Sequence, residues 1–256
     1  MLTRYRKKKI ISGQREEIFI YPEFTKAKKG SRKKKWKTTS EVQQRLNDRN
    51  ATRQLARLIN CNFGTGDYFL TCEYQEWCRP DSIEQVKADM RNFIRRLQYH
   101  YRKLGKVLKY IMVFEEGEFR GNLHVHLFMT GGLDRDVVED LWGRGCANCK
   151  RLQPEHYEGL DRIASYTSKA PKGTKRWIPS RNLDKPIEER SKVISHKEAK
   201  EFVQAMECAD TAYKELNGGR VLEIDKIDNV VNGGMYAAID VIMPMKKQEK
   251  TRRRLI

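Results

Sequence analysis

Hydrophobic residues recur along the chain with two periods, one typical of helices and one typical of strands. Apolar positions three and four residues apart predict a helix that begins at Thr39 or Ser40 and ends near Asn60. The clearest helix follows a capping pair formed by Ser82 and Gln85, and apolar side chains hold one face of it. These are Ile83, Val86, Met90, Phe93, Ile94, Leu97 and Tyr101. This helix is expected to pack against a sheet.

Runs of aromatic and β-branched residues predict strands between and after these helices. The second and third strands are joined as an antiparallel hairpin through the polar, glycine-containing segment 116–122. The expected strands are 68–74, 107–114, 123–129 and, near the end of the chain, 235–243. Further helices are expected at 134–142, at 160–170, and from Ser195, capped by Glu198, to the glycines at 218–219. The order of elements predicts an α+β fold, an antiparallel sheet of about five strands with helices mainly on one face.

The positive charge of the chain is concentrated near its two ends. Lys and Arg total 52 against 34 Asp and Glu, a formal net charge of +18. Residues 1–38 carry +11 of this excess and residues 246–256 carry +5, which leaves only +2 between them. The pattern predicts a basic, largely mobile arm at 1–38, one folded domain at 39–245 and a basic tail at 246–256, with both ends suited to an anionic partner.

The chain shows no signature of a membrane or secreted protein. No segment approaches the roughly 18 consecutive apolar residues of a membrane span, and the N-terminus has no apolar core of a secretory signal. Six cysteines without a repeating spacing do not form a disulfide framework, which favours a reducing compartment. Cys146 and Cys149 form one CxxC pair, but no second pair stands at zinc-site spacing. A cytoplasmic protein without membrane contact is expected.

His124-Val125-His126 is the first group of residues that indicates chemistry. In a strand, alternation places both imidazoles on one face and Val125 on the other, which is a geometry for binding a metal ion through two nitrogens. Glu115 and Glu116 end the preceding strand of the hairpin, so one carboxylate can complete a set of two histidines and one carboxylate. The preceding strand is apolar on both faces, so alternation does not choose between the two glutamates. Hydrogen-bonded core histidines are the alternative interpretation.

Two further patterns suit chemistry on nucleic acid. Tyr166 and Lys169 are three residues apart on the predicted helix 160–170, so the phenol and the ammonium share one side of it. A nearby cation or metal favours phenolate, the form of tyrosine that can act as a nucleophile. On the predicted helix 39–60, four arginines at intervals of four form a basic ridge that suits a phosphate backbone. An equally good interpretation is a solvent-exposed helix face whose arginines pair with Asp and Glu. The four arginines are Arg45, Arg49, Arg53 and Arg57.

Taken in order, these motifs resemble those of a known family. Tyr68 to Cys72, Lys109 to Glu115, Gly121 to His126 and Ile163 to Lys169 resemble the motifs of rolling-circle replication initiators in the His-hydrophobe-His (HUH) endonuclease superfamily. The nearest resemblance is to the single-tyrosine initiators of small single-stranded-DNA phages and bacterial mobile elements. It extends over about 40–190, including 60–63 before the first motif and 180–183 with Pro186 after the last. The resemblance implies the HUH core, a sheet like that of RNA-recognition motifs.

The resemblance also implies a role for each motif residue. His124 and His126 would bind Mg²⁺ or Mn²⁺ together with Glu115, which aligns with the family's glutamate, and Tyr166 would be the nucleophile with Lys169 as its charge partner. The reaction implied is site-specific nicking and joining of single-stranded DNA at a replication origin, through a 5′-phosphotyrosine intermediate. Cys72-Glu73 and a hairpin one residue longer depart from the family pattern. No GxxxxGK[ST] segment is present, so a separate host helicase, in a bacterial cell, is the expected partner.

Other functions remain compatible with these residues. A conjugative relaxase or a tyrosine transposase would use the same chemistry. A non-catalytic, basic nucleic-acid-binding protein would keep the histidines in its core and Tyr166 in packing. A metal-dependent hydrolase would use water in place of Tyr166. The sequence identifies neither the origin sequence nor the oligomeric state.

Overall fold

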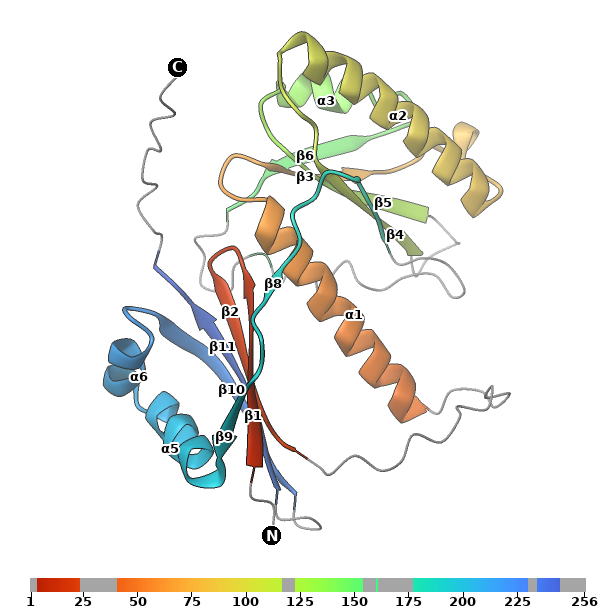
Figure 1. The fold of residues 1–256 in the computed structure, drawn as a ribbon. Helices are drawn as coiled ribbons and strands as arrows, with labels where there is room; N and C mark the ends of the chain where they lie inside the picture. The colour runs from red at the N-terminus through yellow and green to blue at the C-terminus, as the bar shows by residue number, and fades with distance from the viewer. Residues whose placement is uncertain are drawn as a thin grey trace, which may run out of the picture. The chain divides into compact units, whose positions relative to one another are not determined.

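The computed structural model describes residues 4–23, 41–116, 123–153, 160, 177–229 and 234–244. The chain divides into two compact units, each built on an antiparallel sheet. Figure 1 labels the elements of both units. The central unit comprises residues 35–185, and the terminal unit combines residues 1–34 with residues 186–256. The predicted α+β class is therefore confirmed, including a five-stranded antiparallel sheet in the central unit. A second sheet was not predicted.

The central unit follows the predicted order of elements, with two additional strands, 147–151 and 177–179, that were not predicted. Its strands are β3 (Tyr68–Cys72), β4 (Tyr110–Glu116), β5 (Leu123–Met129), β6 (Ala147–Arg151) and β7 (Trp177–Pro179), in the spatial order β6-β3-β5-β4-β7. The helices in its described part are α1 (Glu41–Asn62), the short η1 (Glu76–Cys78), α2 (Ile83–Lys103) and α3 (Arg135–Asp140). Every pairing in this sheet is antiparallel.

Alternation along the strands sends apolar residues to both faces of this sheet. Leu70 of β3 and Leu127 of β5 face α2, whose buried stripe includes Met90, Phe93 and Leu97. This is the stripe that the sequence predicts, and Ser82 caps the helix by accepting a hydrogen bond from the Gln85 amide at 3.3 Å. Burial of such a face is the main source of stability for a helix of this length.

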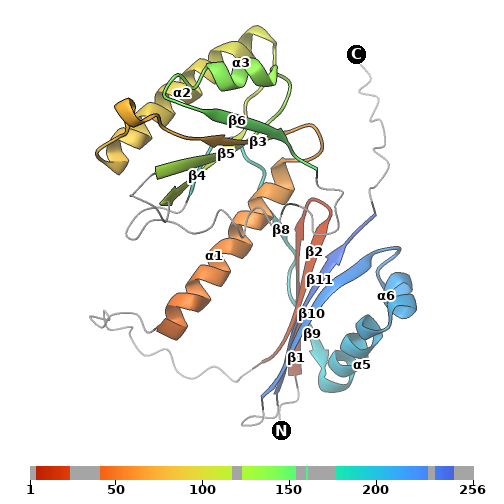
Figure 2. The ribbon, with the colours of Figure 1, turned by 180° about the vertical axis from the view of Figure 1, so that it is seen from behind.

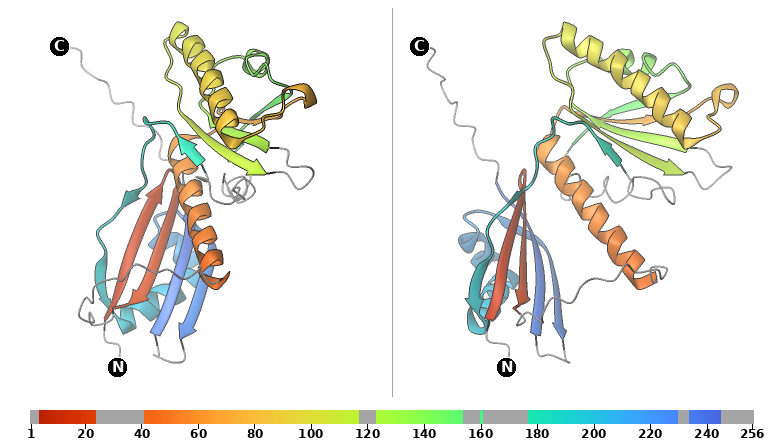
Figure 3. Two further views of the ribbon diagram at one scale, coloured as in Figure 1. Left: turned by 90° about the vertical axis from the view of Figure 1, so that its right-hand side faces the viewer. Right: turned by 45° about the vertical axis from the view of Figure 1, so that its right-hand side comes forward.

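The opposite face of the same sheet packs against α1. Leu55 and Ile59 of α1 cluster with Ile111 and Val113 of β4 and with Phe128 of β5. Figure 3 shows α2 and the C-terminal turns of α1 on opposite sides of the sheet. The expectation of helices mainly on one face holds for α2 and α3, and α1 adds cover to the other face. No helix among the described residues is long and apolar enough to span a membrane.

The terminal unit joins the two ends of the chain. Its strands are β1 (Arg4–Ser12), β2 (Arg15–Pro22), β8 (Ile187–Glu188), β9 (Lys192–Ser195), β10 (Arg220–Asn229) and β11 (Gly234–Ile242). The spatial order is β10-β11-β2-β1, with β8 and β9 both paired to β1. The helices α5 (His196–Glu207) and α6 (Ala209–Glu215) lie against one face (Figure 2). Ile18 of β2 and Ile239 of β11 are direct neighbours in this core.

Residues 4–22 correct the prediction of a mobile N-terminal arm. They form the β1–β2 hairpin in the interior of the six-stranded sheet, so the prediction is wrong for this part of 1–38. Partners neutralise the basic side chains: Arg6 pairs with Glu23 at 2.6 Å, Lys8 with Glu188 at 2.7 Å and Lys9 with Glu16 at 2.6 Å. The predicted domain 39–245 also divides, because residues 186–244 fold with this hairpin. The rest of the predicted arm, 24–38, and the basic tail 246–256 lie outside the described residues.

The C-terminal elements agree with the sequence in part. Ser195 and Glu198 form the predicted capping box, with reciprocal hydrogen bonds at the start of α5. The expected single helix ends at Glu207 and restarts as α6, because Cys208 is in an extended conformation. The predicted last strand is β11, whereas β10 was not predicted.

Candidate active site

The register of the central sheet brings the predicted site residues to one face. His126 lies opposite Thr71 of β3, and His124 lies opposite Glu115 of β4. His124 and His126 alternate with Val125 and Leu127, which are buried in the core under α2. The imidazoles therefore belong to the other face, the one that α1 covers in part.

His126 is held by contacts on both ring nitrogens. Its Nε2 lies 2.7 Å from Glu115 Oε2, and its Nδ1 lies 3.2 Å from Thr71 Oγ1. The Phe69 ring stacks on the imidazole, with ring centroids 5.3 Å apart and ring planes inclined by 10°. Only 5% of His126 is exposed. The ring therefore has one well-defined orientation, which a ligand to a metal ion needs.

Burial sets the charge state of His126. Burial lowers the pKa of His126, and the hydrogen bond and negative charge of Glu115 oppose this shift only in part. The imidazole is therefore neutral near neutral pH, with a lone pair available on one nitrogen. A neutral imidazole is the form that coordinates metals.

His124 has a similar contact on the same side of its ring. Its Nδ1 lies 3.5 Å from Oε1 of Glu73, the residue that follows β3. Thr71 and Glu73 are two residues apart, so both imidazoles turn Nδ1 toward β3. A metal ligand that binds through Nε2 commonly donates its Nδ1 hydrogen to such a partner. The orientation makes Nε2 of each ring the atom that would meet a cation.

The donor set agrees with a divalent cation. Two imidazoles and a carboxylate suit Mn²⁺ well and Mg²⁺ less well, because Mg²⁺ prefers oxygen ligands. Within the described ranges, no three His, Cys, Asp or Glu side chains converge closely enough to hold a metal ion as they stand. His126 instead contacts Glu115 directly, with Nε2 and Oε2 2.7 Å apart. The residues thus fit the metal in type and face.

The register also bears on the choice between the two glutamates. Glu115 lies directly opposite His124 and contacts His126, whereas Glu116 lies opposite Leu123. The structure thus brings Glu115 to the histidines, as the family resemblance implied. The side chain of Glu116 lies outside the described part of the chain.

Other predicted site residues are described only in part. Tyr166 and Lys169 lie outside the described residues, as does nearly all of the predicted helix 160–170. Leu160, at its start, is 1% exposed and packs with α1 and β4. The helix that carries the arginine ridge is present as α1, where Arg49 is exposed and Arg53 and Arg57 are half-buried. Each of these three arginines makes an interaction within the protein, and the side chain of Arg45 lies outside the described part.

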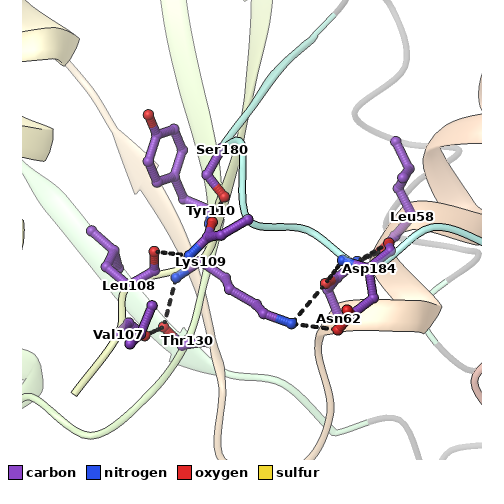
Figure 4. A network of polar contacts seen from close by, with 10 residues as sticks. Leu58, Asn62, Val107, Leu108, Lys109, Tyr110, Thr130, Ser180 and Asp184 are labelled. Carbon is purple, nitrogen blue, oxygen red and sulfur yellow. Dashed lines mark hydrogen bonds and ion pairs between the residues drawn. The ribbon is translucent and has the colours of Figure 1, made fainter.

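A polar clamp of Asn62, Lys109 and Asp184 joins α1, β4 and the segment after β7. The Lys109 ammonium donates to Asn62 Oδ1 at 3.1 Å and pairs with Asp184 Oδ2 at 2.5 Å, as Figure 4 shows. Asn62 also accepts from the Asp184 amide at 2.8 Å and donates to the Asp184 carbonyl at 2.8 Å. The clamp therefore anchors the segment that follows β7 to α1 and to the start of β4.

Two segments of the family resemblance make structural contacts at or beside this clamp. Residues 60–63 contribute Asn62, and residues 180–183 contribute Ser180, which accepts a hydrogen bond from the Tyr110 amide at 3.1 Å, and Asn182, which donates to the Leu108 carbonyl at 3.1 Å. Thr71, Glu73 and the clamp were not predicted as parts of the site. Thr71 and Glu73 were detectable, because alternation along β3 places them on the histidine face once the sheet order is known.

The Cys146–Cys149 pair is not part of this site. Cys149 is buried under α2 beside Leu70, and burial, with a smaller contribution from Glu139, raises its pKa to about 12. Cys146 is exposed, and both thiols are free. Cys149 belongs to the core through β6.

Residues 67–171 match the model of a family of replication-associated proteins, the ORF2 family. The match covers about two fifths of the chain, from β3 through β6 to the segment that contains Tyr166. This similarity supports a role as a replication initiator. No curated protein sequence and no solved structure is significantly similar to the chain.

Proposed function

We propose that this protein is a rolling-circle replication initiator that nicks and rejoins single-stranded DNA at an origin. The observation that carries the proposal is the placement of His124, His126 and Glu115 on one sheet face, within the segment that matches a replication-associated family. The sequence adds Tyr166 and Lys169 at the end of the same segment.

Each side chain has a defined part in the proposed reaction. His124, His126 and Glu115 would hold Mg²⁺ or Mn²⁺, which supplies Lewis-acid stabilisation of charge on a phosphate. Thr71 and Glu73 keep the two imidazoles turned toward that position. Phe69 and the surrounding apolar side chains restrict the entry of water around His126, which strengthens the electrostatic contacts there.

Tyr166 would then exchange one phosphate ester for another. Its phenol oxygen attacks the scissile phosphorus, the phenol proton is lost to solvent or a base, and the 3′ oxygen leaves and takes up a proton. The Lys169 ammonium would stabilise the negative charge that develops on the reacting oxygens. The product is a 5′-phosphotyrosine with a free 3′-OH, and reversal of the same exchange rejoins a strand without ATP.

DNA capture is assigned to basic residues outside the reacting centre. Arg45, Arg49, Arg53 and Arg57 on α1, together with the basic segments near both ends of the chain, give salt-sensitive affinity through counterion release. Such contacts position the backbone and do not read sequence. Strand separation is assigned to a separate helicase.

A covalent-adduct assay tests the proposal. With Mn²⁺ and labelled single-stranded origin DNA, the wild-type protein should form a protein-linked 5′ fragment, and Tyr166→Phe should form none. Tyr157→Phe, in the same segment, is the matched control and should keep full activity. His126→Ala or EDTA should lower the rate by about 100-fold or more, since each removes stabilisation of the transition state.

The two alternatives that use different chemistry, or none, give different results in this assay. Cleavage that persists in Tyr166→Phe would identify a hydrolase that uses water. An absence of any cleavage or adduct, with DNA binding intact, would identify a non-catalytic binding protein. Either result contradicts the proposal.

A further inference from the structure

η1 presents an unusually exposed tryptophan. Trp77 is 77% exposed, the highest value for a large hydrophobic side chain in the part of the chain that the structure describes. Trp142 of the same unit is fully buried, which is the usual environment of an indole in a folded protein. Because the Trp77 ring is exposed, the free protein forgoes the stabilisation that burial of the ring would give. The exposed ring is accessible to a ligand.

The turn that carries Trp77 is held firmly in place. The indole Nε1 donates to Gln75 Oε1 at 2.8 Å, and the Cys78 amide donates to the Gln75 carbonyl at 3.1 Å. The Gln75 amide in turn donates to the Arg144 carbonyl at 3.0 Å, and the Cys78 thiol donates to the same carbonyl. A ring fixed in this way loses little conformational entropy when a planar group stacks on it.

A positioned cation lies next to this turn. The Arg144 guanidinium is 3.1 Å from Asp89, a carboxylate whose side chain is 8% exposed and which also accepts from the Tyr74 hydroxyl at 3.4 Å. Arg144 itself is 46% exposed, so its remaining N–H groups face solvent. Arg79, directly after the turn, is exposed as well. An exposed aromatic ring on a turn that is hydrogen-bonded to a cationic residue suits an unpaired base and its phosphate.

The turn stands at the histidine end of β3. Glu73, which contacts His124, precedes Trp77 by four residues, and its amide is bonded to the Cys146 carbonyl at 2.8 Å. The chain between them is thus anchored to the same sheet that carries the histidines.

We propose that Trp77 is a stacking platform for an unpaired base of single-stranded DNA, with Arg144 as the contact for the adjoining phosphate. The choice of DNA as the ligand rests on the proposed function. The platform would hold a nucleotide on one side of the scissile phosphate and so contribute to the position of the nick.

Equilibrium binding without metal tests the platform separately from cleavage. The probe is a fluorescein-labelled single-stranded DNA of mixed sequence, of about 20 nucleotides, in EDTA at about 0.2 M salt to weaken the basic tails. Trp77→Ala should weaken binding by about 5- to 100-fold, and Trp77→Phe should restore most of it, because phenylalanine still stacks. Affinity for a duplex of the same sequence should not change. Tyr99→Ala, an exposed aromatic on α2, is the matched control and should bind as wild type.

Two results separate this proposal from the proposed function. If Trp77→Ala binds the single strand as tightly as wild type, the platform is wrong, whatever the cleavage assay shows. If Trp77→Ala weakens binding but Tyr166→Phe still cleaves, the nicking mechanism fails and the platform stands. A change shared equally by Trp77→Ala and Tyr99→Ala would also overturn the platform, because it would show a loss that is not specific to this ring.

Discussion

The two sheets of this protein bury polar side chains in different ways. In the terminal unit, two lysines of β1 have partners within the protein. Lys9 forms an ion pair with Glu16 at 2.6 Å, and Lys7 Nζ lies 3.2 Å from the centre of the Phe202 ring. In the central unit, His126 and Glu115 contact each other in a cluster that also offers His124. The lysine contacts of the terminal unit stabilise the fold. The contact between His126 and Glu115 in the central unit can instead be replaced by contacts of both side chains with a ligand.

This difference indicates where to look for chemistry in a two-sheet protein. Burial lowers the pKa of Lys7 in the terminal unit and the pKa of His126 in the central unit. A shifted pKa alone therefore does not show which unit carries the candidate site. The distinguishing feature is a set of donors on one sheet face that could share a cation. Only the central unit overlaps the segment similar to the replication-associated family.

The largest expected effect comes from the core of the terminal unit. Tyr5 is fully buried, stacks on His196 with centroids 5.3 Å apart, and accepts a hydrogen bond from the Met235 amide at 3.1 Å. Tyr5→Ala should lower the free energy of unfolding by about 3–5 kcal/mol, because it leaves a cavity and an unpaired amide. Denaturant unfolding measures the loss, and hydrogen exchange should locate it in β2 and β11.

Tyr5→Phe is the control for this change. It keeps the ring and removes only the hydroxyl, so it should cost about 1 kcal/mol. If Tyr5→Ala were as stable as wild type, the β1–β2 hairpin would not belong to the core of the terminal unit. The contrast between a sheet that stabilises the fold and a sheet that carries the candidate site would then be unsupported.

An intermediate effect is expected from the polar clamp of the central unit. Lys109→Met removes the ammonium that joins Asn62 to Asp184, and should cost about 1 kcal/mol because Asp184, 72% exposed, regains water. Hydrogen exchange should rise in 177–185. Lys87→Met removes a looser pair with Glu84, at 3.9 Å, and should change stability by only a few tenths of a kcal/mol. Equal effects of the two variants would show that the clamp is an ordinary surface contact.

The smallest expected effect is the acid sensitivity of α5. The Ser195 amide donates to Glu198, and this hydrogen bond lowers the pKa of Glu198 below its usual 4.5. The carboxylate is therefore favoured in the folded state. Its stabilisation is complete above about pH 5 and is lost as the pH falls through 4.5 toward the lower folded value. Glu198→Gln keeps the cap and should lack this part of the acid dependence in thermal melts from about pH 6 to pH 3. Parallel curves for the two proteins would contradict the assignment.

Most elements of the central unit were predictable because their signals are local, whereas the short strands β6 and β7 were missed. Ser82 and the stripe of α2 stand close together in sequence, and β5 has the predicted bounds. Alternation along β5 was also sufficient to place His124 and His126 on one face. Pairing Glu115 with them required the register between β4 and β5, which depends on contacts between strands.

The terminal unit was less predictable because its strands depend on distant partners. β1 has basic side chains at five of its first six positions, which is typical of a solvated arm, and it becomes a strand because Glu16, Glu23 and Glu188 pair with those charges. β10 was missed because a bulge between Val221 and Glu223 interrupts its alternation. Trp77 was missed because an aromatic residue in a turn carries no periodic signal.

The pairing of β2 with β11 constrains the order in which the protein can fold on the ribosome. The β1–β2 hairpin leaves the exit tunnel first, but β11 follows more than 200 residues later. That pairing has to wait until β11 has been synthesised, and the entropy of closing so long a loop slows it further. All residues of the central unit are synthesised well before β11, so this unit can fold first. Until β11 pairs with it, β2 has an unpaired strand edge that a chaperone could cover.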